Sequence, residues 1–246
     1  MKLGLQLYSI GDEMDKNFDL AIEKVAKIGY DGVEFAGYGG KTAKELKKCI
    51  ADNGLEIASS HTDIPDKEED FKPTLEYAAE AGIPALICAG KSFGFWFPYD
   101  QFMRNMEHVN RYTELAATYG IQIGFHNHYM EFAQCNGKFF LEMLYKHSLP
   151  NFLLEIDCYW AEYADQDCMK IIKKYKDKTT TYCHYKQMAK DSKANVTLDK
   201  GRIDFKAISD YLKKHDAKWA IIEQEGIDIP SIEAAKINHD FARKVM

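Results

Sequence analysis

The chain has 246 residues, of which 32 are basic and 38 are acidic, and its formal net charge is −6. A mildly acidic chain with scattered lysines lacks the basic stripe that displaces counterions from phosphates, so the composition argues against nucleic acids and membrane surfaces as partners. Its apolar fraction of 46% is ample for a buried core and excludes a disordered chain.

The first ten residues, MKLGLQLYSI, do not have the form of a signal peptide, because Gln6 and Tyr8 interrupt the apolar run. No segment approaches the roughly 18 uninterrupted apolar residues that a membrane span requires. The six cysteines include no C-x-x-C pair, and we expect them to be free thiols. We therefore expect a soluble, cytoplasmic protein.

Short apolar or β-branched segments alternate with longer segments of helical periodicity along the whole chain. Strands are predicted at 2–8, 32–36, 55–60, 85–89, 121–126, 152–157, 179–184 and 219–223. Helices are predicted at 18–28, 43–53, 71–81, 102–119, 138–147, 167–176, 205–215 and 232–245. Glycines at 29, 54, 82 and 120 follow four of these helices, where a left-handed residue ends a helix at low cost.

This alternation predicts an α/β protein with a single (β/α)₈ TIM barrel domain over residues 1–246. The strand–helix unit recurs about every 30 residues without a linker, which is typical of that fold. A doubly wound open sheet is the alternative. Such a sheet usually carries a G-x-G-x-x-G turn after its first strand, whereas SIGDEM at 9–14 contains one glycine.

Potential metal ligands follow the last four predicted strands, and active sites of (β/α)₈ barrels lie at these carboxyl ends. These ligands are Glu131, Asp157, His184 and Glu223. Three carboxylates converging without a cation would repel one another, so the set favours a divalent ion over separate ion pairs. Mn²⁺, Mg²⁺ and Co²⁺ suit such an oxygen-rich site, and Zn²⁺ is a further candidate.

Several sequence strings resemble the sugar phosphate isomerase/epimerase family, part of the xylose isomerase-like TIM barrel superfamily. They are QLYSI at 6–10, GVEFAG at 32–37, SSH at 59–61, HNHYMEF at 126–132, IDCYW at 156–160, HYK at 184–186 and IIEQE at 221–225. The resemblance covers nearly the whole chain. It implies a metal-dependent sugar isomerase or epimerase that abstracts a proton next to a carbonyl through a metal-bound enediolate.

The resemblance also implies roles for individual residues. The metal would be held by Glu131, Asp157, His184 and Glu223, and Glu131 and Glu223 would also act as acid and base. The residues implied around the substrate are Gln6, Glu34, His61, His128 and Lys186.

Two histidines of the HNHYMEF segment, His126 and His128, lie two residues apart and so on the same face of an extended chain. Both would face the barrel mouth, with His128 the next candidate for the base and His126 in contact with substrate. In many superfamily members the metal-binding glutamate aligns with His126. His126 is therefore the alternative to Glu131 as the ligand from strand five.

Lys186 lies two residues after His184 and shares its direction, so it is a candidate for stabilising a developing oxyanion; a solvated lysine is the alternative. Glu34 and His61 end strands two and three, where we expect hydrogen bonds to sugar hydroxyls or a structural pair. The aromatic run FGFWFP at 93–98, which includes Trp96, is expected to stack on a sugar face or to form a subunit contact in a homodimer.

Two positions depart from the family pattern. Relatives commonly have arginine at Gly11 and aspartate at Gln187, so the substrate specificity does not carry over. Phosphate recognition has one weak signal, DKGRIDF at 199–205, in which Gly201 and Arg202 lie just before a predicted helix.

Three other functions share this barrel. A dehydratase or lyase acting on a 3-keto sugar or inosose would use the same first proton abstraction. An endonuclease IV-type nuclease needs more histidines and a basic DNA-binding face, which the acidic composition opposes. A sugar-binding barrel without catalysis is the remaining alternative.

Overall fold

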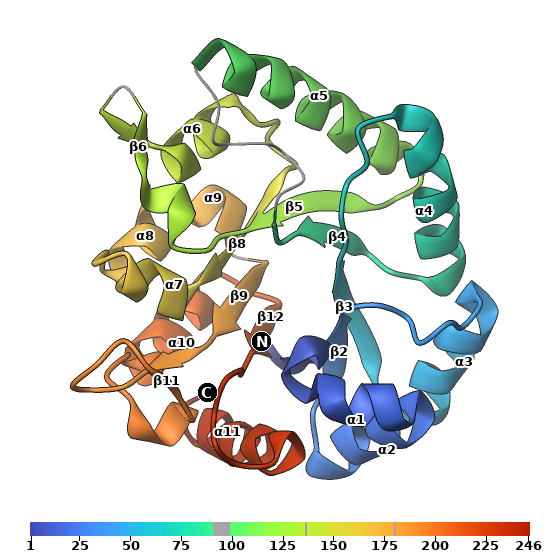
Figure 1. The fold of residues 1–246 in the computed structure, drawn as a ribbon, viewed down its shortest axis with the longest axis vertical. Helices are drawn as coiled ribbons and strands as arrows, with labels where there is room; N and C mark the ends of the chain where they lie inside the picture. Colours follow the sequence, from blue (N-terminus) through green and yellow to red (C-terminus); the bar gives the residue numbers. More distant parts are fainter. Residues whose placement is uncertain (91–98, 136, 180) are drawn as a thin grey trace.

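The computed structural model of the protein describes residues 1–90, 99–135, 137–179 and 181–246. Within these ranges, eight parallel strands form a closed barrel in the order β1-β12-β9-β8-β5-β4-β3-β2, with helices around it (Figure 1). The strands are β1 (Lys2–Gln6), β2 (Gly32–Phe35), β3 (Glu56–His61), β4 (Ala85–Cys88), β5 (Gln122–His126), β8 (Leu153–Asp157), β9 (Tyr182–Tyr185) and β12 (Trp219–Ile222). The predicted TIM barrel is confirmed.

Helices connect successive barrel strands. The longer ones are α2 (Phe18–Ile28), α3 (Ala43–Asp52), α4 (Glu68–Ala81), α5 (Tyr99–Thr118), α6 (Phe140–His147), α8 (Cys168–Lys174), α10 (Phe205–Lys214) and α11 (Ser231–Val245). Local sequence fixes several ends: Thr42 and Glu45 form a capping box on α3, and Gly29 ends α2 in the left-handed region. In Figure 1, α11 lies beside α2, where the end of the chain meets its beginning.

Shorter elements lie in the connections between the barrel strands and the longer helices. They are η1 (Leu7–Ile10), α1 (Gly11–Lys16), η3 (Met130–Phe132), β6 (Gln134–Cys135), β7 (Lys138–Phe139), α7 (Cys158–Tyr163), α9 (Lys176–Thr179), β10 (Gln187–Met188), β11 (Asn195–Val196) and η4 (Leu198–Lys200). Of these, α9 precedes β9, and the others follow the carboxyl ends of barrel strands. Several of them lie next to the polar end of the barrel and shape its opening.

Several predicted boundaries differ from the structure, and three of the differences have a clear local reason. The first strand ends at Gln6 because its side-chain oxygen accepts from the Tyr8 backbone N–H and starts a 3-10 turn. The predicted helix at 138–147 begins at Phe140, since the two preceding residues pair with β6. The seventh barrel strand begins at Tyr182, because Thr179 still belongs to α9.

An apolar layer fills the barrel interior at the amino ends of the strands, and we call it the floor. It consists of Ala58, Ala85, Ile87, Leu153, Tyr182, Trp219 and Ile221, all of them buried. Glycine in β2 leaves room for the indole, because a Cβ on Gly32 would lie 2.7 Å from Cη2 of Trp219. The floor fills the barrel at the amino ends of its strands, and the polar residues lie toward the carboxyl ends.

Two other sequence predictions meet the described part of the chain. Cys49, Cys88, Cys158, Cys168 and Cys183, the cysteines whose side chains the structure describes, are free thiols. Among the described helices, none combines the length and apolarity needed to span a bilayer.

Candidate active site

Polar side chains form a second layer inside the barrel, directly above the floor. Because side chains alternate along a strand, the next inward positions after the floor belong to this layer. β8 illustrates the pattern, with Leu153 in the floor and Glu155 and Asp157 above it, all three buried. The polar layer comprises Gln6, Glu34, His61, His126, Glu155, Asp157, His184 and Glu223.

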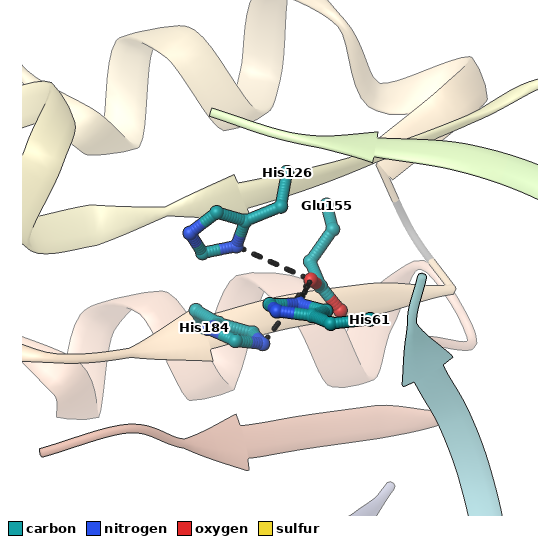
Figure 2. A group of neighbouring side chains, drawn as sticks. All are labelled: His61, His126, Glu155 and His184. Carbon is teal, nitrogen blue, oxygen red and sulfur yellow. Dashed lines mark hydrogen bonds and ion pairs between the residues drawn. The ribbon is translucent and has the colours of Figure 1, made fainter. Parts of the chain in front are cut away.

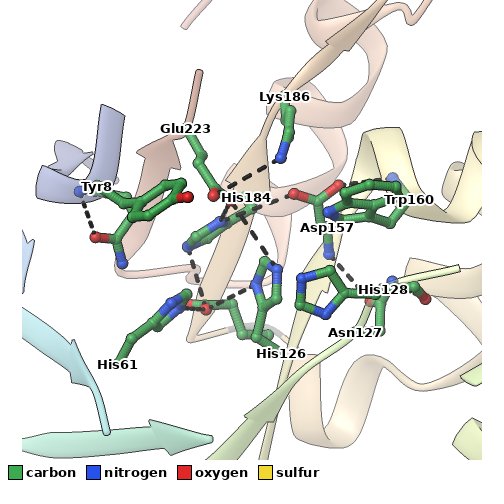
Figure 3. A network of polar contacts seen from close by, with 12 residues as sticks. Tyr8, His61, His126, Asn127, His128, Asp157, Trp160, His184, Lys186 and Glu223 are labelled. Carbon is green, nitrogen blue, oxygen red and sulfur yellow. Dashed lines mark hydrogen bonds and ion pairs between the residues drawn. The ribbon is translucent and has the colours of Figure 1, made fainter. Parts of the chain in front are cut away.

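Four members of the polar layer converge on one point. His126, Asp157, His184 and Glu223 each offer one ligand atom, and these atoms lie within 4.8 Å of one another. His184 Nδ1 lies 3.0 Å from Glu223 Oε2 and 3.9 Å from Asp157 Oδ2, while His126 Nε2 lies 4.0 Å from Glu223 Oε2 (Figure 3). We call these four residues the ligand group. Their spacing is compatible with a single metal ion.

The chemistry of the ligand group fits a cation. Asp157 Oδ2 is buried without a hydrogen-bond partner among the described residues, and burial raises the pKa of Asp157 to about 7. Burial also opposes ionisation of Glu223, but the charges of Lys186 and His184 outweigh it and lower the pKa of Glu223. A divalent ion would satisfy the free oxygen of Asp157 and neutralise both carboxylates.

Glu131 lies apart from this group. The structure places it in η3, after β5, where its buried carboxylate accepts a 2.7 Å hydrogen bond from the His128 backbone N–H. Burial raises the pKa of Glu131. Of the four ligands predicted from the sequence, Asp157, His184 and Glu223 thus lie together, and the described residue that joins them from β5 is His126.

Gln6, Glu34 and His61 form a second group of contacts in the polar layer, centred on the Glu34 carboxylate. Gln6 Nε2 donates to Glu34 Oε1 at 2.7 Å, and the same oxygen lies 3.0 Å from His61 Nε2 and 2.8 Å from His184 Nε2. Although burial opposes their charged forms, mutual attraction lowers the pKa of Glu34 and, with Glu155, raises the pKa of His61 to about 10. His61 alone of these three also lines the cavity described below.

Lys186 is buried beside the ligand group. Its ammonium lies 3.7 Å from Glu223 Oε1, is paired with Glu225, and stands 4.8 Å from the ring centroid of Trp160. Burial opposes its charge, but the surrounding carboxylates raise the pKa of Lys186. Lys186 therefore places a positive charge next to the ligand group and is not a solvated lysine.

A cavity of about 370 Å³ opens at the carboxyl ends of the strands. It is lined by Tyr8, Ala36, His61, Thr62, Asp63, Ala89, Gly90, His128, Glu223 and Glu225. His128 packs 5.3 Å from Trp160, and burial lowers the pKa of His128 to about 4. Trp96 and the rest of the aromatic run at 93–98 lie outside the described residues.

The weak phosphate signal at 199–205 corresponds to a loop whose amides are already used. The Arg202 backbone N–H donates to Met188 O, and the Ile203 N–H donates to the side chain of Gln187. The Arg202 guanidinium lies 3.6 Å from Glu162. These contacts account for Gln187, which closes the loop on itself.

Sequence reasoning missed Glu155. Its Oε2 lies 2.9 Å from His61 Nε2, 3.2 Å from His126 Nδ1 and 3.1 Å from His184 Nε2 (Figure 2). Burial and the charge of Glu34 oppose its ionisation, but the imidazoles lower the pKa of Glu155 to about 2. The signal available was its position two residues before Asp157, hence on the same face of the strand.

Comparisons with known proteins identify the family and the fold. The family model described as xylose isomerase-like TIM barrel matches residues 22–245. A sugar phosphate isomerase/epimerase from Parabacteroides distasonis has a similar structure, with a TM-score of 0.82 and 24% identity over 99% of this chain and 95% of that one. A probable 3-DHS dehydratase from Bacillus anthracis has a TM-score of 0.77 and 15% identity over 99% of each chain.

A curated relative is similar over a shorter stretch. An inosose dehydratase from Mesomycoplasma hyopneumoniae is 23% identical over 132 residues, which cover 46% of this chain. The match spans 44% of that relative, less than half of its length.

Proposed function

The chain belongs to the xylose isomerase-like TIM barrel family, and we propose that it is a divalent-metal-dependent sugar isomerase or epimerase. The superfamily comprises sugar isomerases, epimerases and dehydratases, so we take this chain to be an enzyme that acts on a small sugar-like molecule. The observation that carries the proposal is the ligand group. His126, Asp157, His184 and Glu223 meet beside a cavity of about 370 Å³, which is the size of a small-molecule site.

The donor atoms guide the choice of metal. The ligand group offers two imidazole nitrogens and two carboxylate oxygens, a more nitrogen-rich set than the sequence predicted. Mixed donors suit Mn²⁺ and Co²⁺ better than Mg²⁺, and they also suit Zn²⁺. We propose Mn²⁺ as the first ion to test. When bound, such an ion would act as a Lewis acid on a carbonyl oxygen of the substrate.

The surrounding residues would handle the proton. We assign His128 as the base, because its ring lines the cavity beside Glu223 yet lies outside the ligand group. Lys186, held next to Glu223, would stabilise the negative charge that develops on a substrate oxygen as the enediolate forms. Asp63 and Glu225 also line the cavity and would accept hydrogen bonds from sugar hydroxyls. Glu131 would fix the turn that carries His128.

The experiment is a screen of unmodified and phosphorylated aldoses and ketoses with Mn²⁺ in D₂O, analysed by mass spectrometry and NMR. Isomerisation or epimerisation predicts a product of unchanged composition in which one carbon-bound hydrogen has been exchanged for deuterium. The screen is repeated with Co²⁺, Zn²⁺ and Mg²⁺ in place of Mn²⁺. If no sugar exchanges hydrogen for deuterium with any of these four ions, the proposal is contradicted.

A dehydratase is the second candidate, favoured by the inosose dehydratase match and the 3-DHS dehydratase fold. It begins with the same proton abstraction and then expels a β-hydroxyl group. Loss of one water and the absorbance of an enone in the same screen would identify elimination and replace the first assignment.

A further inference from the structure

Glu155 occupies an unusual position beneath the proposed metal centre. It is fully buried on β8, and its Oε2 faces three imidazole nitrogens. Its other oxygen, Oε1, is buried without a partner among the described residues. An unpaired carboxylate oxygen in a barrel interior opposes folding, so packing does not account for a glutamate here.

In each of the two histidines of the ligand group, one ring nitrogen faces the other ligands and the second ring nitrogen faces Glu155. His126 turns Nε2 toward Glu223 and Nδ1 toward Glu155, whereas His184 turns Nδ1 toward Asp157 and Glu223 and Nε2 toward Glu34 and Glu155. A neutral imidazole that ligates a metal through one nitrogen carries its proton on the other, and an acceptor there fixes both the tautomer and the ring orientation.

The acceptors on this inner side are not equivalent for the two rings. His184 Nε2 has two carboxylates within reach, Glu34 at 2.8 Å and Glu155 at 3.1 Å. For His126, the contact of 3.2 Å with Glu155 is the hydrogen bond that the described residues provide. Glu34 instead contacts Gln6, Ser59, His61 and His184. Among the described residues, Glu155 is therefore the acceptor that Nδ1 of His126 has.

We propose that Glu155 is a positioning residue that accepts the Nδ1–H of His126, and so keeps Nε2 of that ring unprotonated and directed at the metal. The proposal rests on the proposed metal-dependent function. Glu155 also supports His184, a role that it shares with Glu34.

The test compares Glu155→Gln with Glu34→Gln. Both replace a fully buried carboxylate of the polar layer by an isosteric amide, and both touch His61 and His184, but Glu155 alone contacts His126. The first readout is the tautomer of His126 in the metal-free protein, measured by two-bond ¹⁵N–¹H NMR correlations. We expect Nδ1–H in the wild type and in Glu34→Gln, and a shift toward Nε2–H in Glu155→Gln.

The second readout is Mn²⁺ affinity, measured by calorimetry. Loss of such a supporting carboxylate typically weakens metal binding about 10- to 100-fold, which we expect for Glu155→Gln and not for Glu34→Gln. If Glu155→Gln does not fold, Glu155→Asp, which withdraws the carboxylate by one methylene, replaces it.

The outcomes separate the two proposals. An unchanged His126 tautomer in the Glu155 variants, or an equal loss of affinity in the Glu34 variant, would overturn the positioning role. If the wild type binds no Mn²⁺ and the His126 tautomer still shifts in Glu155→Gln, the metal-dependent function is ruled out and the positioning of His126 by Glu155 stands.

Discussion

Two layers of side chains fill the same barrel, one directly above the other on the same strands. Leu153 of the floor and Asp157 of the polar layer share one face of β8, and Glu223 of the polar layer follows β12 two residues after Ile221 of the floor. The floor lowers the free energy of the folded state by removing apolar surface from water. The polar layer removes ionisable groups from water, a cost that only partners can offset.

Residues that stabilise the fold and residues that carry the proposed chemistry therefore lie at different heights in the barrel. Alternation along a strand decides which residues face inward, and the position along the strand decides which layer they join. Changes in the floor should therefore reduce the free energy of unfolding and leave the chemistry intact. Changes in the ligand group should reduce metal binding and turnover and leave the free energy of unfolding close to that of the wild type.

The largest effect is expected for Asp157→Asn. Asparagine keeps the shape and can still accept from the Trp160 backbone N–H, so the variant should fold. It removes the charge that a cation needs, and a Lewis-acid contribution of several kcal/mol corresponds to a loss of turnover of about 10³-fold or more. Deuterium exchange into the sugar identified by the screen is the measurement.

A binding measurement checks the same variant independently of substrate. Mn²⁺ at about 100 times its dissociation constant should add about 2.7 kcal/mol to the free energy of unfolding of the wild type. Thermal unfolding with and without Mn²⁺ should show no such gain for Asp157→Asn. An equal gain in both proteins would remove Asp157 from the ligand group.

His128→Asn tests the assignment of the base. A positioned base contributes about 10²- to 10⁴-fold to the rate, so kcat should fall by at least about 10²-fold. Because His128 lies outside the ligand group, Mn²⁺ affinity should stay within about 3-fold of the wild type. Normal turnover in the variant would transfer the role of base to another residue of the cavity.

Leu153→Ala tests the floor beneath the same strand. Leu153 is 6% exposed and packs against Gly124, where a Cβ would lie 2.9 Å from Cβ of Leu153. Truncation of a buried leucine costs about 2–5 kcal/mol, which chemical denaturation would measure. Mn²⁺ affinity of the folded variant should be unchanged, and a loss of affinity of 10-fold or more would show that the two layers are coupled.

Within the polar layer, the residues that end the strands could be predicted from the sequence better than those inside the strands. Asp157, His184 and Glu223 were found because they end predicted strands and converge once the barrel closes. Glu155 stands within its strand, where a single acidic residue among Leu153, Leu154 and Ile156 gives no sign of the histidines on β5 and β9. Those contacts arise only from the closure of the barrel.

The segment after β5 shows the opposite failure. Once a strand ends, side-chain direction no longer follows a period of two, and the 3-10 turn of η3 directs the Glu131 carboxylate to the His128 backbone N–H. The sequence spacing predicts that Glu131 follows the fifth barrel strand, but it does not determine the direction of the Glu131 side chain. The strand residue His126, whose direction alternation does fix, lies in the ligand group.

The smallest effect is expected for Ile221→Val, a conservative change in the floor. Ile221 is fully buried in the floor, pairs with Gly4 of β1, and precedes Glu223 by two residues on the same face. Removal of one methylene from a buried isoleucine costs about 0.5–1.5 kcal/mol in the free energy of unfolding. kcat and Mn²⁺ affinity should remain within about 2-fold, because the change leaves the backbone that carries Glu223 in place. Glu223→Gln is the matched variant. It should lose Mn²⁺ binding and retain the free energy of unfolding of the wild type. If Ile221→Val instead weakened Mn²⁺ binding in proportion to its loss of stability, the floor would be part of the catalytic support and the two layers would have to be treated as one.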